Sequence, residues 1–133
     1  MTNYMSHSDK GTVEYNSLLW CDAASCEGVR YQIARVSVGR RIQLARLIRE
    51  IGRKLEFREA SSEVREKLEA MVLSQEIDRV YLEWGLEAIE GLSIDGETAT
   101  PLSLIELGPA ELSAEILARI KSECGLNEEE RKN

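Results

Sequence analysis

The sequence predicts a mainly α fold, a small helical domain with a short N-terminal β-hairpin. Of its 133 residues 43% are hydrophobic but only 5% are aromatic, leaving an aliphatic core of the kind that favours helix packing. Apolar residues recur every three to four positions beyond residue 40, whereas strict alternation is confined to a short stretch near residue 30. This length suits one domain, which we place at residues 12–126, between a disordered arm at 1–11 and a frayed charged tail at 127–133.

Two segments after the polar arm have strand character. TVEYNSLLW and VRYQIARVSV are rich in β-branched and aromatic residues, and Val29, Tyr31 and Ile33 alternate with polar or small neighbours. The loop CDAASCEG separates these segments, so we expect them to pair as a hairpin. Because a two-stranded hairpin is marginally stable alone, it should pack on the helices or on another subunit.

Two long helices are expected next. The apolar spacing within residues 40–58 indicates an amphipathic helix of about five turns. A second and longer helix should begin at Ser62, a good N-cap residue, and should carry a broad apolar stripe as far as Gly91.

Turn and cap residues mark the remaining elements. Asp95-Gly96 predicts a tight turn, because glycine accepts a positive φ and aspartate can bond its own backbone. Thr100 should cap a short helix that ends at Gly108, and a last helix should occupy 109–125.

The charge pattern limits the classes of partner. A net charge of -7 argues against a general binder of nucleic acid or of anionic membranes, since both are negative. Residues 40–58 nevertheless hold seven basic and two acidic residues, which indicates one basic face on an acidic protein. The sequence has neither an apolar run of about 20 residues nor a signal peptide, and its three cysteines indicate reduced thiols. We therefore expect a cytoplasmic protein that does not bind membranes.

The residue types needed for catalysis or metal binding are poorly placed. His7 is the only histidine and lies in the predicted arm, where nothing would hold it as a general base. No glycine-rich loop follows a strand to cradle phosphate. Cys21, Cys26 and Cys124 lack the second close pair of ligands that structural zinc requires. We expect no enzyme activity, no cofactor and no metal.

Two kinds of binding remain open on residue chemistry alone. The predicted basic helix could cross phosphates, which makes a nucleic-acid-binding or regulatory protein the alternative hypothesis. Its charged-partner face would be formed by Arg40, Arg41, Arg46, Arg49, Arg53 and Lys54. Protein binding is the other possibility, and here Trp84 could belong equally to the core or to a contact surface.

A resemblance favours protein binding. The second helix is followed by WGLEAIEGLSIDGE, Thr-Pro, a short leucine-rich segment and the helix PAELSAEILARI. Over about Glu76 to Ile120 this order resembles small tail assembly chaperones of tailed bacteriophages. The N-terminal region with the hairpin does not share the pattern.

The resemblance implies a non-enzymatic homo-oligomer that binds and solubilises the tape measure protein during tail morphogenesis, and possibly also contacts the tail tube protein. It would act in the cytoplasm of the host cell, and nucleic acid is not among the expected partners. Uncovered apolar stripes would bind the helical partner. The predicted protein-binding residues are Tyr81, Trp84, Leu86, Ile89, Leu92 and Ile94.

Overall fold

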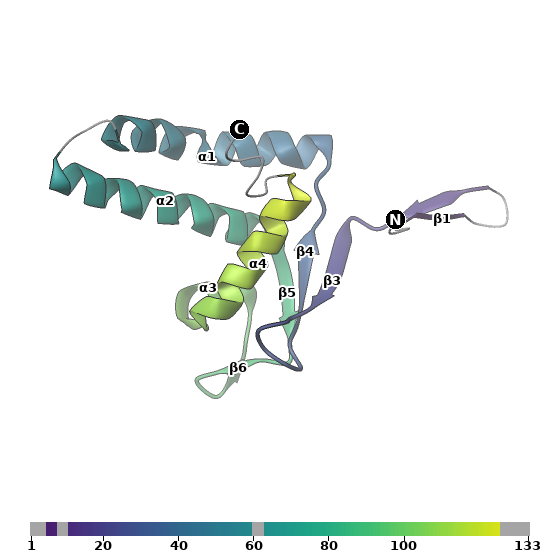
Figure 1. Ribbon diagram of the computed structural model, residues 1–133. Helices are drawn as coiled ribbons and strands as arrows, with labels where there is room; N and C mark the ends of the chain where they lie inside the picture. Colours follow the sequence, from purple (N-terminus) through teal and green to yellow (C-terminus); the bar gives the residue numbers. More distant parts are fainter. Residues whose placement is uncertain (1–4, 8–10, 60–62, 126–133) are drawn as a thin grey trace.

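The computed structural model describes residues 5–7, 11–59 and 63–125, and Figure 1 shows how they are arranged. Two long helices, α1 (Val38–Glu59) and α2 (Val64–Gly85), lie side by side as an antiparallel helical hairpin. One end of this hairpin packs on a body built from a small sheet and two shorter helices, while the other end extends past the body. None of the described helices is both long and apolar enough to cross a membrane.

The body contains a three-stranded antiparallel sheet, so the fold mixes helix and sheet. The expectation of a mainly α domain with only a hairpin is therefore wrong. Strand β3 (Leu18–Asp22) pairs with β4 (Arg30–Ala34), as the alternation predicts, with Cys21 opposite Tyr31. The third strand, β5 (Leu86–Glu90), pairs with the other edge of β4.

Strand β5 occupies positions where the sequence predicts the last turns of the second helix. Its register against β4 shifts between Gln32 and Ile33, and this β-bulge leaves Glu87 as an extra residue in the ladder. Because of the bulge, the buried residues Leu86 and Ile89 are three positions apart, a spacing that a helix also gives. The period-two signal of a strand is thereby lost from the sequence.

The N-terminal segment also differs from its prediction. Strand β1 (Met5–His7) pairs with β2 (Val13–Tyr15) in an antiparallel two-stranded sheet, so part of the predicted disordered arm at 1–11 has regular structure. Residues 1–4 and 8–10 lie outside the described residues. The polar composition of residues 1–11 did not indicate this pairing.

The helical hairpin follows the apolar spacing of the sequence. α1 covers the predicted segment 40–58. α2 begins after Glu63, whose backbone is extended and whose side chain makes no cap hydrogen bond; the predicted cap, Ser62, lies outside the described residues. Near the body the Trp84 indole N–H donates to Gln43 Oε1 at 3.2 Å, which joins α2 to α1.

The predicted Asp95-Gly96 turn is present and connects two very short strands, β6 (Ser93–Ile94) and β7 (Glu97–Thr98). Asp95 has a φ of 52° and Gly96 a φ of 84°. Two successive residues with positive φ are what a two-residue type I′ hairpin turn requires, and Asp-Gly is among the pairs that favour it.

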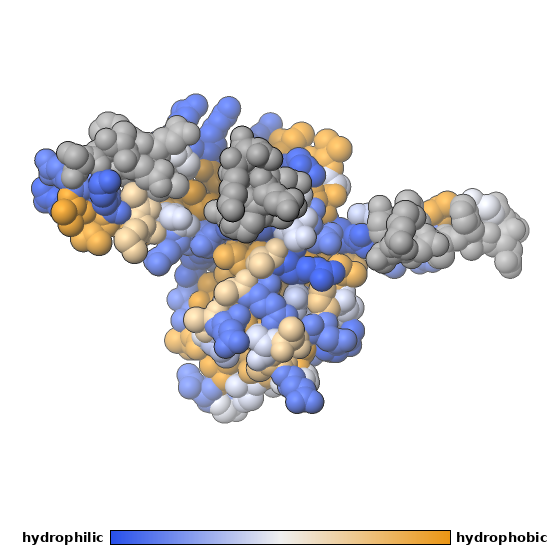
Figure 2. All heavy atoms as spheres, in the orientation of Figure 1, coloured by the Kyte–Doolittle hydropathy of each residue, from blue (hydrophilic) through white to orange (hydrophobic). Residues whose placement is uncertain are grey.

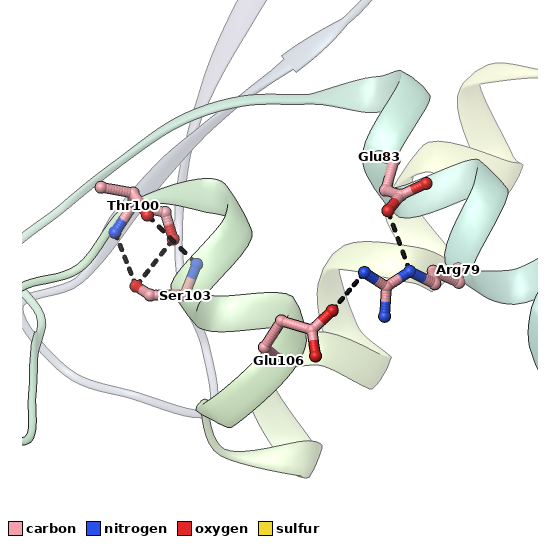
Figure 3. Close-up of polar contacts among 5 residues, drawn as sticks. All are labelled: Arg79, Glu83, Thr100, Ser103 and Glu106. Carbon is pink, nitrogen blue, oxygen red and sulfur yellow. Dashed lines mark hydrogen bonds and ion pairs between the residues drawn. The ribbon is translucent and has the colours of Figure 1, made fainter.

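Two shorter helices complete the body, α3 (Pro101–Leu107) and α4 (Ala110–Glu123). Thr100 caps α3 as predicted: its hydroxyl accepts a hydrogen bond from the Ser103 N–H at 3.1 Å (Figure 3). In return the Ser103 hydroxyl accepts from the Thr100 N–H at 2.9 Å, so two otherwise unpaired donors are satisfied. The predicted charged tail at 127–133 lies outside the described residues.

The core of the body is aliphatic, as the composition predicts. It lies where α3, α4 and the inner end of α2 meet the sheet. The largest fully buried side chains are Ile33, Leu104, Leu112, Ile116 and Ile120.

Candidate interaction surface

The residues predicted to bind protein lie in or against the core of the body. Four of the six are buried, with exposed fractions of 9% or less: Tyr81, Trp84, Leu86 and Ile89. The other two are partly buried against the same core: Leu92 and Ile94. These side chains hold α2 and β5 in the body, so Trp84 takes the core role that the sequence left open.

The first residue of the predicted basic face is also used within the chain. The Arg40 guanidinium lies over the Trp84 ring, 5.5 Å from its centroid, and its Nη2 is 3.6 Å from a carboxylate oxygen of Glu87. A cation over an aromatic ring is attracted by the ring quadrupole. Arg40 therefore fixes α1 on the body, and the bulged Glu87 of β5 supplies the countercharge.

The other members of that face are exposed on α1: Arg41, Arg46, Arg49, Arg53 and Lys54. Arg46 and Arg49 line a shallow depression together with Ile42 and Ala45. Within the described residues neither arginine makes an ion pair, whereas Arg53 lies 3.8 Å from Glu50 of the same helix. Positions 46, 49 and 53 fall on one side of α1, and we call these three arginines the basic row.

A row of uncovered apolar side chains runs along the outer half of α2. Val64, Leu68 and Met71 are 74%, 58% and 60% exposed. They are separated by four and then three residues, so they share one side of the helix, and we call them the apolar row. Figure 2 shows hydrophobic atoms, in orange, at the outer end of the hairpin on its lower side, where α2 lies in Figure 1.

The same side of α2 is covered where the helix reaches the body. The four-and-three spacing continues to Asp78 and Leu82, and Leu82 is only 8% exposed. Asp78 accepts a hydrogen bond from the Lys121 ammonium of α4 at 3.0 Å, and the neighbouring Arg79 pairs with Glu106 of α3 (Figure 3). Helices α3 and α4 therefore cover the inner part of this side, while the apolar row faces outward.

The sequence predicts one broad apolar stripe along this helix, and the apolar row is the part of that stripe which the structure leaves exposed. The outer half of α2 carries two rows of apolar residues. The other row contains the buried Ala70 and Leu73 and continues to the partly buried Ile77, and α2 packs against α1 along its length. Exposed apolar residues grouped on one side of a helix are candidates for contact with another molecule, so the apolar row is the candidate interaction surface.

The titratable cluster of the body supports structure rather than reactivity. The Glu115 carboxylate accepts hydrogen bonds from the N–H groups of Ala24 at 2.8 Å and Ser25 at 2.9 Å, and from the Ser25 hydroxyl at 2.6 Å. Burial alone would raise the pKa of Glu115, but these hydrogen bonds outweigh burial and lower it. Burial raises the pKa of Tyr31 to about 12 and also raises the pKa of the Cys21 thiol, which favours the unreactive protonated form.

The other chemical candidates give no site among the described residues. That part of the chain contains no group of three or more His, Cys, Asp or Glu residues that could hold a metal ion. Cys21, Cys26 and Cys124 are free thiols. His7 belongs to β1, but its side chain lies outside the described features.

No family model, no curated protein and no solved structure matches this chain.

Proposed function

We propose that this protein is a non-enzymatic assembly chaperone that binds an amphipathic helix of its partner along the apolar row of α2. The proposal rests mainly on the difference in side-chain exposure along one side of α2. Leu82 is covered by the body, while Val64, Leu68 and Met71 of the same side are more than half exposed.

The spacing of the apolar row fits a helical partner. Alternating steps of four and three residues are the pattern of the seam between two packed helices, and anchors at this spacing are typical of helix-in-groove recognition. Covering apolar surface is worth roughly 25 cal/mol per Å², so three side chains give a modest, reversible contribution. Reversible binding suits a chaperone, which must later release its partner.

The partner we propose is the tape measure protein of a tailed bacteriophage, with the tail tube protein as a possible second partner. The support for this identity is the resemblance of residues 76–120 to small tail assembly chaperones. A long helical protein exposes apolar stripes that would otherwise aggregate, and the apolar row could cover such a stripe. The site of action would be the host cytoplasm.

Coexpression with the long helical protein encoded by the longest neighbouring gene tests this proposal. The readout is the fraction of that partner in the soluble fraction and its coelution with the chaperone. We expect the double variant Leu68→Ser with Met71→Ser to lose the partner, because hydroxyls replace two of the three apolar anchors. Its own folding should persist, since both positions are exposed.

Leu102→Ser is the matched control, because Leu102 is 60% exposed on α3 but lies outside the apolar row. This variant should keep the partner soluble. If the double variant solubilises the partner as well as the wild type does, the apolar row is not the binding surface. If the wild type fails to bind any helical partner, the chaperone function itself is wrong.

A further inference from the structure

We infer that the free edge of β3 binds an extended segment of a partner protein, which adds a fourth strand to the sheet and carries an acidic side chain opposite Arg119 of α4. The sheet has the order β3-β4-β5, so β3 and β5 are its two edges (Figure 1). Helix α3 packs against β5, whereas β4 is the main neighbour of β3. This edge is separate from the apolar row, and the inference does not rest on the proposed function.

The backbone of β3 has hydrogen-bonding groups that point away from the sheet. At one end of the ladder with β4, the Ser17 carbonyl accepts a hydrogen bond from the Arg35 N–H at 2.9 Å. At the other end, the Ala23 N–H donates to the Val29 carbonyl at 2.8 Å. Odd-numbered positions of β3 therefore bond to β4, because the direction of the backbone groups alternates along a strand. No strand among the described residues pairs with the outward groups, which belong to Leu18, Trp20 and Asp22.

The free edge is apolar and lacks the features that commonly protect such edges. Lysine, proline or a bulge usually discourages pairing, but β3 reads LLWCD and its register with β4 is continuous. Its core-facing side chains are also incompletely covered. Cys21 is partly buried, whereas Tyr31 opposite it on β4 is only 2% exposed, and Leu19 differs from Ile33 in the same way. An added strand would complete the cover of both side chains.

The charge beside this edge indicates an acidic partner. Burial raises the pKa of the Cys21 thiol, and the nearby Arg119 charge is the strongest influence that opposes burial. Arg119 is exposed and makes no ion pair within the described part of the chain. The acids one turn away on α4 are already engaged, since Glu115 binds the loop after β3 and Glu123 lies 4.0 Å from Arg35. A carboxylate on the added strand would give Arg119 its countercharge.

The outer face of β3 offers an apolar contact to the same segment. Side chains alternate along a strand, so Trp20 lies on the face opposite Cys21, where the Arg30 guanidinium is 4.8 Å from its ring centroid. An apolar residue across from Trp20 would pack beside its ring. Pairing with β3 of a second copy would place Leu19 or Cys21 near Arg119, and no acid. An acidic segment of another protein therefore fits this edge better than a second copy does.

Amide hydrogen exchange of the full-length chain, followed by NMR, tests whether the edge is free. In the protein alone the N–H groups of Leu18, Trp20 and Asp22 should exchange faster than those of Leu19 and Cys21, which bond to β4. The probe is a nine-residue peptide that alternates valine and threonine, with the central threonine replaced by glutamate. It should slow exchange of the three outward amides. Protection of these amides that rises with protein concentration alone would overturn the inference, because a second copy would then occupy the edge.

Proline at position 18 tests the backbone contact. Leu18→Pro removes an outward N–H without breaking a bond to β4, so the chain should fold and should bind the glutamate peptide roughly fivefold more weakly. The matched control, Leu18→Thr, keeps the N–H and should bind within about twofold of the wild type. Circular dichroism checks folding, and fluorescence polarisation of the labelled peptide measures binding. Equal binding by the folded proline variant and the control would overturn the inference.

The central residue of the peptide tests the role of Arg119. The wild type should bind the glutamate peptide about fivefold more tightly than a matched lysine peptide, and Arg119→Glu should reverse this order. Leu68→Ser with Met71→Ser should bind the glutamate peptide as the wild type does, because the apolar row is a different surface. The inference fails if the wild type binds both peptides equally, or binds neither at up to about 1 mM. It also fails if the peptide changes the NMR signals of the apolar row and not those of the β3 edge.

Discussion

The body and the outer half of the helical hairpin use similar aliphatic residues in opposite ways. In the body, Ile33, Leu104 and Ile116 are fully buried between helices and sheet. In the outer hairpin, Leu68 and Met71 are more than half exposed, although they lie on a side of α2 that the body covers further along. The comparison teaches that one side of α2 carries apolar residues at both of its ends, yet the chain itself covers only the part that reaches the body.

The largest expected effect comes from a cavity in the body. Ile116→Ala removes a fully buried side chain from α4, and the lost packing should lower the free energy of unfolding by about 2–5 kcal/mol. Urea denaturation followed by circular dichroism measures the change. A loss below about 1 kcal/mol would mean that the body is as loosely packed as the outer hairpin.

Two helical glycines sharpen the comparison, because replacing each by alanine should change the free energy of unfolding in opposite directions. A Cβ at Gly85 would lie 2.9 Å from the side chain of the buried Ile120, so Gly85→Ala should destabilise by about 1–3 kcal/mol. At Gly52, in α1, a Cβ would meet nothing within 4 Å, so Gly52→Ala should stabilise by about 1 kcal/mol through helix propensity. Thermal unfolding of both variants checks the prediction, and equal signs would contradict it.

The stability of the body should depend on pH through Glu115. Because the pKa of Glu115 is lowered in the folded state, its stabilisation is present above the ordinary carboxyl pKa of 4.5 and is lost as the pH falls through the folded value. Glu115→Gln should therefore destabilise at about pH 7, and the difference from wild type should shrink towards about pH 3. Urea denaturation at both pH values measures this.

Ser25→Ala is the milder companion variant in that experiment. It removes the hydroxyl donor to Glu115 but keeps the two backbone donors, so a smaller loss in the same pH window is expected. If the loss of unfolding free energy caused by Glu115→Gln is the same at both pH values, the folded state does not favour the charged carboxylate.

The smallest expected effect belongs to the apolar row. Leu68→Ala removes an exposed side chain, so the free energy of unfolding of the isolated protein should change by no more than about 0.5 kcal/mol. Chemical denaturation of the pure protein checks this, and Leu82→Ala on the same side of α2 should cost several times more. Equal losses would mean that both parts of this side are covered.

The sequence predicted those elements whose signals are local. The Thr100 cap, the Asp95-Gly96 turn and the helix of residues 40–58 each depend on neighbours within a few positions. Strand β5 could not be recognised, because its bulge spaces Leu86 and Ile89 as in a helix and its pairing partner lies far away in the chain. The mainly α prediction failed at this element.

The candidate surface was harder to predict than the fold. Exposure is a property of the packed chain, and apolar residues at helical spacing look the same whether another helix covers them or not. The sequence therefore favoured Trp84, which packs inside, and missed Leu68 and Met71, which face outward. Of the basic face, Arg46 and Arg49 are exposed as the hypothesis requires, whereas Arg40 is engaged with Trp84 and Glu87.

The helical hairpin is also the covalent connection between β4 and β5, and this has a consequence for the order of folding. Arg30 pairs with Glu90 only after the whole of α1 and α2 has been traversed, and closing so long a disordered segment is entropically unfavourable. Contacts between α1 and α2 form between segments adjacent in the chain, and such contacts form early. If the helical hairpin forms first, it brings β4 and β5 close together. The exposed hairpin would then guide the pairing of the strands in the buried body.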